Sequence, residues 1–220
     1  KAAKNYLYDI AEAGYNHLGG EYYRNKVGEL IDVWNLTQYD NKKFRDVIGH
    51  WAEKEIMFLL EKGWISGYLD GTYKPNNPVT RAQAAKIISN FLGLTPTNEK
   101  ISFSDVSQNH WALNVVNLVA QHKIMNGIGD GRFAPDALIT RAQMAQIFYN
   151  AGFYSHSNNN QMNSFIDVGH NHWAYEAIET MKQEGIITGY PNGRFGPDDS
   201  TSRAQIAAII YRLNEKGLKY

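Results

Sequence analysis

Three arginines stand at corresponding positions of a motif that the sequence contains three times, and each could bind an anion. They are Arg81, Arg141 and Arg203, within Thr-Arg-Ala-Gln twice and then Ser-Arg-Ala-Gln. A Ser or Thr three residues before a Gln, ahead of a helical apolar run, predicts a capping box with the arginine at the first helical position. A cation is disfavoured there unless an anion joins it, and the two together suit a carboxylate or phosphate. Alternatively, each arginine pairs with an aspartate of its own repeat; both interpretations can hold at once.

The arginine motif ends a longer sequence that the chain also repeats three times. Each copy has Phe-x-Asp-Val, then His-Trp-Ala and an apolar run, then a Gly, an Asp-Gly or Asn-Gly turn, and a Pro before the arginine motif. The corresponding residues are Asp46, Asp105 and Asp167; His50, His110 and His172; Trp51, Trp111 and Trp173; and Gly67, Gly127 and Gly189. This self-similarity predicts a repeat of helix, short extended loop and helix. The turns predict hairpins with positive φ at both central residues.

We expect three repeats, at 44–102, 103–164 and 165–220, after a lead-in of two helices at 1–43 that carries no chemical motif. A helix pair of this size cannot bury both its faces, so the copies must pack on one another. A closed ring of three leaves no exposed terminal face, unlike an open stack. Each junction of such a ring forms a cleft that an arginine can face.

Composition limits the classes of function. Lys plus Arg and Asp plus Glu are 22 each, and no segment is a basic block, which argues against binding of nucleic acid but not against a discrete anion pocket. The chain has no cysteine, which excludes disulfides and thiolate metal sites. No apolar run reaches membrane-spanning length, so we expect no membrane insertion. Because Lys1 begins inside a helical pattern without a signal peptide, we expect a piece of a larger protein.

The order of these motifs over roughly residues 44–216 resembles the S-layer homology (SLH) repeat. The resemblance implies a mainly α fold of three helix-loop-helix repeats around a pseudo-threefold axis, preceded by the N-terminal helices. It also implies a secreted protein of the bacterial cell surface, cell wall or S-layer. Members of the family hold surface proteins non-covalently to secondary cell-wall polysaccharide. The usual recognised group is a pyruvate ketal on N-acetylmannosamine, bound in grooves between repeats, without catalysis, cofactor or metal.

The resemblance also implies roles for the repeated residues. The three arginines would clamp the carboxylate, and the three tryptophans would form an aromatic wall for the sugar, with core packing as the alternative. The aspartates would orient hydroxyls or the arginine, unless they serve pairing or capping. The glycines would bring backbone close to the ligand, unless turn geometry alone requires them. The histidines are expected to satisfy local backbone groups rather than form a metal site.

The chain departs from the family pattern at some positions. Many members have Glu where this chain has Gln83, Gln143 and Gln205, which removes a negative charge beside the predicted anion site. Repeat one is one residue shorter between Val47 and His50, so we expect one or two working grooves rather than three equal ones.

Two other functions compete with wall anchoring. One is a protein-interaction module that self-assembles into a surface lattice. The other is a glycosidase, which is disfavoured because the aspartates occur once per repeat, whereas acid–base catalysis needs two carboxyl groups in unlike environments.

Overall fold

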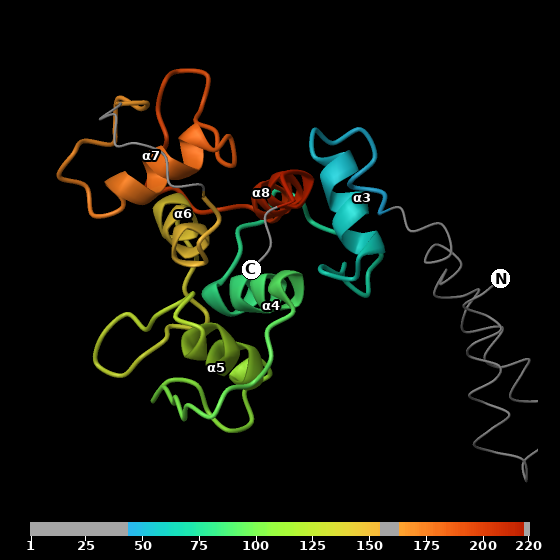
Figure 1. Ribbon diagram of the computed structural model, residues 1–220. Coiled ribbons are helices and arrows are strands. Elements are labelled where there is room, and N and C mark those ends of the chain that lie inside the picture. Colours follow the sequence, from blue (N-terminus) through green and yellow to red (C-terminus); the bar gives the residue numbers. More distant parts are fainter. Residues whose placement is uncertain (1–43, 155–162, 218–220) are drawn as a thin grey trace, which may run out of the picture.

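The computed structural model describes residues 44–154 and 163–217, which form six helices (Figure 1). They are α3 (Glu53–Glu61) and α4 (Arg81–Leu92), α5 (Leu113–Gln121) and α6 (Arg141–Asn150), and α7 (Tyr175–Gln183) and α8 (Arg203–Glu215). The predicted mainly α fold with one helix pair per repeat is confirmed. The two helices predicted at 1–43 lie outside the described residues. Within the described ranges, no helix is both long and apolar enough to cross a bilayer.

The second helix of each repeat begins with the predicted capping box. The Thr80 hydroxyl accepts from the Gln83 amide at 3.2 Å, and Gln83 Oε1 accepts from the Thr80 amide at 3.1 Å. α6 and α8 begin in the same way. The first helices use a histidine instead: His50 Nδ1 accepts from the amide of the N-cap residue Ala52, and His110 and His172 repeat this bond. The histidines therefore satisfy local backbone groups, as predicted.

The helices form a closed ring. Each second helix packs on the first helix of the following repeat: α4 on α5, α6 on α7, and α8 back on α3. In Figure 1, α4, α6 and α8 lie around the centre, and α3, α5 and α7 lie outside them. Side chains of the inner helices, such as Ile88, Phe148 and Ile210, are fully buried there. The last repeat thus covers the face that the first would otherwise expose.

Three backbone hydrogen bonds join the repeats at the centre of this ring. The Val79 amide donates to the Thr201 carbonyl, the Thr201 amide to the Ile139 carbonyl, and the Ile139 amide to the Val79 carbonyl, at 2.9–3.0 Å. All three residues are buried. Thr201 is the polar member, and its buried Oγ1 has no hydrogen-bond partner among the described residues. Because each bond links a different pair of repeats, the cycle of hydrogen bonds forms only when all three repeats are present.

The repeated aspartates hold the loop between the two helices. Asp105 accepts from the Phe133 amide at 2.8 Å and from the Ala134 amide at 2.7 Å. Ala134 has a φ of 56°, so the carboxylate fixes a left-handed residue. Burial acts to raise the pKa of Asp105, but backbone N–H groups, those of Phe133 and Ala134 first, together with the charge of Arg132 outweigh it, and the pKa is lowered. Asp46 and Asp167 bind the equivalent amides. The aspartates therefore support the fold and do not pair with the repeated arginines.

The predicted hairpin turn with two positive φ angles is found only in the second repeat, at Asp130 (51°) and Gly131 (66°). In the first and third repeats only the final glycine of the turn, Gly71 or Gly193, has positive φ. These repeats form a three-residue loop that ends in a left-handed glycine. The residue before Asp130 is Gly129, whereas Pro191 fixes a negative φ at that position in the third repeat.

Candidate ligand-binding grooves

Each repeated arginine reaches across a junction to the next repeat in the ring. Arg203 Nε donates to the Tyr73 carbonyl at 2.7 Å, and its Nη2 donates to the Ser66 carbonyl at 2.8 Å. The same two bonds join Arg81 to Phe133 and Asn126, and Arg141 to Phe195 and Thr188. Pairing with an aspartate of the same repeat is therefore wrong. Within the described part of the chain, Nη1 of each arginine has no hydrogen-bond partner.

The amide groups at the helix starts are not free for an anion. The Arg81 amide donates to the Ala137 carbonyl and the Ala82 amide to the Pro135 carbonyl, both at 2.9 Å, and the Gln83 amide donates to the capping hydroxyl. α6 and α8 repeat the carbonyl bonds with the following repeat. The predicted combination of helix amides and guanidinium is thus corrected: the amides join the repeats, and only the guanidinium remains for a ligand.

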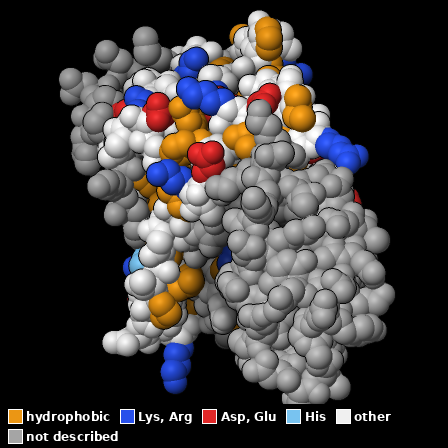
Figure 2. Space-filling view, turned by 90° about the vertical axis from the view of Figure 1, so that its right-hand side faces the viewer, with side chains coloured by type: hydrophobic (Ala, Val, Ile, Leu, Met, Phe, Trp, Pro, Cys, Tyr) orange, Lys and Arg blue, Asp and Glu red, His pale blue; other side chains and the backbone are white. Residues whose placement is uncertain are grey.

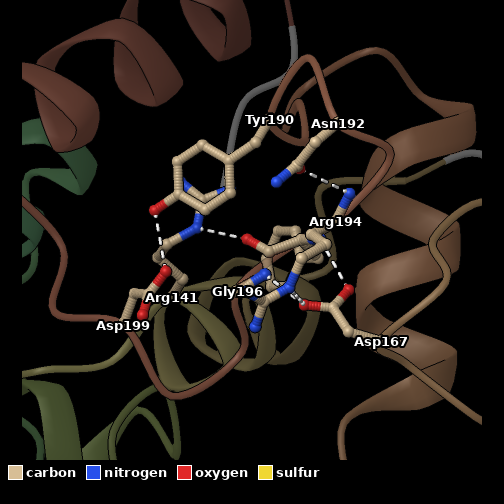
Figure 3. Close-up of polar contacts among 8 residues, drawn as sticks. Arg141, Asp167, Tyr190, Asn192, Arg194, Gly196 and Asp199 are labelled. Carbon is tan, nitrogen blue, oxygen red and sulfur yellow. Dashed lines mark hydrogen bonds and ion pairs between the residues drawn. The ribbon is translucent and has the colours of Figure 1, made fainter.

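Aromatic rings pack on the guanidinium groups. Arg203 lies 4.2 Å from the Tyr73 ring centroid and 5.0 Å from that of Tyr68. Arg141 contacts the equivalent rings, with its guanidinium 4.5 Å from the Phe195 ring centroid and 4.8 Å from that of Tyr190, whose hydroxyl donates to Asp199 (Figure 3). At the third junction, Ile128 occupies the position of these tyrosines, and within the described ranges Arg81 packs on the Phe133 ring but on no second ring. Burial lowers the pKa of Arg81 and of Arg141, yet an arginine stays charged at physiological pH.

One groove lies beside Arg141, between the second and third repeats, with a volume of about 540 Å³. We call it the Arg141 groove. The turn of the third repeat lines it through Gly189 and Tyr190, and Gln205 comes from the capping box of α8. Trp51 of the first repeat completes the lining. All three repeats therefore contribute to this groove.

A second groove, of about 470 Å³, lies beside Arg203, between the third and first repeats. We call it the Arg203 groove. It has the same construction: Gly67 and Tyr68 come from the turn, Gln83 from the capping box of α4, and Trp111 from the second repeat. Each groove lies between two neighbouring repeats, as predicted, but its tryptophan comes from the remaining repeat.

The repeated tryptophans are surface residues. Trp51, Trp111 and Trp173 are 60%, 63% and 61% exposed. Each ring packs on the histidine before it, at centroid distances of 5.4–5.8 Å, instead of entering the core. Core packing, which the sequence left open, is therefore not their role. An exposed ring at the edge of a groove suits the apolar face of a sugar.

The repeated glycines are required by close packing inside each repeat. A Cβ on Gly67 would overlap the ring of Phe44, and a Cβ on Gly127 would lie 2.7 Å from the Arg132 carbonyl oxygen. Gly189 has equivalent neighbours. Glycine is required at these three positions because neighbouring atoms leave no space for a Cβ, and not because the backbone has a positive φ. Because the residue before each glycine supplies a carbonyl to the junction arginine, this packing also positions the guanidinium.

Several residues that line the grooves were not predicted as site residues, among them Tyr68, Tyr190, Lys86 and Arg212. The aromatic after the glycine was visible in two copies, but nothing in the sequence showed that it packs on an arginine from another repeat. Among the described residues that line the two grooves there is no aspartate or glutamate. No group of three His, Cys, Asp or Glu in the described ranges could hold a metal ion.

Comparison with known proteins agrees with this architecture. The family model described as the S-layer homology domain matches residues 43–85, 102–145 and 164–207, so the chain belongs to the S-layer homology domain family. The chain is 35% identical over 162 residues to a cellulosome-anchoring protein of Acetivibrio thermocellus, which covers 70% of the chain and 36% of that protein. It is 33% identical over 177 residues to S-layer protein EA1 of Bacillus anthracis, covering 80% of the chain and 20% of that protein.

A third relative is an amylopullulanase of Thermoanaerobacterium thermosulfurigenes. It is 29% identical over 220 residues, covering 96% of the chain and 12% of that protein. The chain thus spans little more than a third of these relatives at most.

Proposed function

We propose that the chain anchors a larger surface protein non-covalently to the bacterial cell wall by binding acidic secondary cell-wall polysaccharide. Its family and its S-layer and cellulosome-anchoring relatives indicate a cell-surface protein associated with the cell wall. The recognised group in this proposal is a pyruvate ketal on N-acetylmannosamine, whose single carboxylate meets the arginine of a groove.

The observation that carries this proposal is the state of the groove arginines. Two nitrogens of Arg203 are fixed by carbonyls and its plane is held by two rings, so the guanidinium needs no reorganisation to receive a ligand. Within the described residues, Nη1 has no partner and no acidic side chain lines the groove to neutralise the charge. An exposed tryptophan stands at the same groove. A carboxylate on a sugar fits this combination of cation and aromatic ring.

Two grooves on one rigid ring favour a repeating polymer over a free sugar. When one groove is occupied, a second unit of the same polymer binds with a high effective concentration, which can raise apparent affinity by about 10²–10⁴. Weak contacts in each groove are then sufficient for stable anchoring.

The test is sedimentation of the protein with purified wall polysaccharide before and after mild acid removal of pyruvate. We expect binding to the untreated polymer and loss of binding after treatment. Equal binding to both would refute recognition of the ketal.

Tryptophan variants test the grooves without disturbing the fold. Trp51→Ala and Trp111→Ala should each weaken binding, and the double variant should weaken it further, because these exposed rings contribute little to the core. Leu69→Ala is the matched control, since Leu69 is 90% exposed and lines neither groove. Unchanged binding by the double tryptophan variant would exclude the grooves as the site.

Self-assembly into a surface lattice is a second candidate function. Exposed aliphatic side chains, Leu69 and Ile166 among them, favour it, and apolar side chains are interspersed with charged ones on the described part of the face in Figure 2. Concentration-dependent assembly without polysaccharide, measured by light scattering, would support it.

Catalysis has no comparable support. Hydrolysis of a glycosidic bond by the usual route needs two carboxyl groups beside the substrate, and neither groove has an acidic residue in its described lining. The amylopullulanase relative is a much longer protein, of which this chain covers only a small part. We expect no release of reducing sugar from wall preparations.

A further inference from the structure

The two grooves share a feature that the threefold repeat does not require. Each contains a second cation on the second helix of the repeat whose turn lines the groove: Arg212 on α8 in the Arg141 groove, and Lys86 on α4 in the Arg203 groove. These two residues are not equivalent to each other by repeat position. In the aligned repeats, Arg212 corresponds to Asn90 and Asn150, whereas Lys86 corresponds to Gln146 and Ala208. Each groove therefore has a second positive charge, but the residue that carries it stands at a different position of the repeat in each case.

Arg212 is held in its groove by the fold. Its Nη1 donates to the Ile186 carbonyl at 2.9 Å, and its other guanidinium nitrogens have no hydrogen-bond partner among the described residues. Burial lowers the pKa of Arg212, and Glu55 on α3 opposes this, but Glu55 does not line the groove. Arg212 is half-buried, and no aspartate or glutamate is among the described residues that line its groove, which favours an anionic ligand there.

The hydrogen bond that Arg212 donates to the Ile186 carbonyl can also be made by a neutral residue. Asn90 Nδ2 donates to the Trp64 carbonyl at 3.2 Å, and Asn150 Nδ2 donates to the Ile124 carbonyl at 3.5 Å. An asparagine thus serves the structural bond in two repeats, and the arginine of the third adds charge. Lys86, in turn, is exposed and has no ion pair within the described residues.

The third junction differs at both helix positions. Gln146 Nε2 donates to Asn150 Oδ1 at 2.8 Å, so the two equivalent residues are neutral and bonded to each other. Arg81 there also lacks the tyrosine that packs on Arg141 and on Arg203. The third junction has a lysine at a different position: Lys123, in the loop after α5, is equivalent to Gly63, which lines the Arg203 groove, but it does not lie on the second helix.

We propose that Arg212 and Lys86 are anion-binding residues that act beside Arg141 and Arg203, and that they make two of the three junctions the binding sites for an acidic sugar. This inference rests on the proposed function. It names residues outside the repeated motif as the determinants of which junctions bind.

The tryptophans allow each junction to be observed separately. Indole N–H signals in ¹H–¹⁵N spectra are followed while pyruvylated N-acetylmannosamine methyl glycoside is added to the full chain. Trp51 reports on the Arg141 groove, Trp111 on the Arg203 groove, and Trp173 occupies the equivalent position at the third junction. We expect Trp51 and Trp111 to titrate, and Trp173 to require at least about tenfold more glycoside.

Two substitutions copied from the protein's own repeats test the cations. Arg212→Asn should raise the dissociation constant reported by Trp51 about fivefold and leave that reported by Trp111 unchanged; Lys86→Gln should do the reverse. Lys216→Asn, an exposed change just after α8, is the control for net charge and should alter neither. Thermal unfolding of each variant verifies that the fold is kept.

The possible results separate the two proposals. Titration of Trp51 and Trp111 that is unaffected by Arg212→Asn and Lys86→Gln overturns this inference and leaves the proposed function standing. Equal titration of all three tryptophans overturns the selection of two junctions. No response of any indole to the glycoside overturns the proposed function, and this inference with it.

Discussion

The buried hydroxyl of Thr201 gives a prediction of increased stability. Its Oγ1 has no hydrogen-bond partner in the part of the chain that the structure describes, while Val79 and Ile139, its equivalents on the axis, are apolar and fully buried. A buried polar group without a partner costs about 1–3 kcal/mol. Thr201→Val removes that cost and keeps the branched shape, and the backbone bonds of the axis do not involve the side chain. We expect the free energy of unfolding to rise by about 1–2 kcal/mol.

Urea unfolding followed by circular dichroism measures this change. With a denaturant slope of about 2 kcal/mol/M, the midpoint should rise by roughly 0.5–1 M without a change of slope. Val79→Thr is the reciprocal control, because it introduces a second unpaired hydroxyl at the axis and should lower the midpoint. If Thr201→Val lowers the midpoint or leaves it unchanged, the hydroxyl has a partner in solution and the reasoning is refuted.

Three further predictions follow from the junctions and loops. Lys123→Gly should stabilise the protein by about 1 kcal/mol in thermal unfolding, because Lys123 has a φ of 56° where the other repeats have glycine; a lower midpoint would contradict this. Arg203→Gln should cost about 2–4 kcal/mol in urea unfolding by leaving two carbonyls unpaired, and a loss below 1 kcal/mol would contradict that role. The pKa of Asp105 and of Asp167 is lowered in the fold, so their stabilisation is present above the ordinary value of 3.8 and is lost as pH falls through the folded pKa. Asp105→Asn should flatten the acid limb of a stability–pH curve, and an unchanged limb would argue against it.

Much of the fold could be predicted because its signals are local. A capping box involves residues three apart, so Thr80 and Gln83 identify the start of α4 without reference to the rest of the chain. The threefold repetition then predicts that the copies pack on one another, and ring closure follows from the need to cover both end faces. The turn was predicted incorrectly in two copies because its type depends on the residue before Asp-Gly or Asn-Gly, which is Leu69 or Pro191 there.

The candidate site was less predictable because its parts come from distant positions. Arg203 and Ser66 are 137 residues apart in sequence, and only the ring arrangement brings them together. For the same reason, the sequence could not show that Trp51 belongs to the groove of Arg141. The predicted free helix amides were wrong because the carbonyls that occupy them belong to the following repeat, and no local pattern indicates such a partner.

A ring whose final member covers its first has no intrinsic beginning. If a peptide linker joined residue 217 to residue 44 and the chain were opened before residue 103, the permuted protein would retain every junction, including the contact of α8 with α3. Removal of a single repeat is a very different change, because it exposes two apolar faces and breaks the bonds at the axis. Evolution could therefore relocate the attachment point of a fused partner more easily than it could shorten the module.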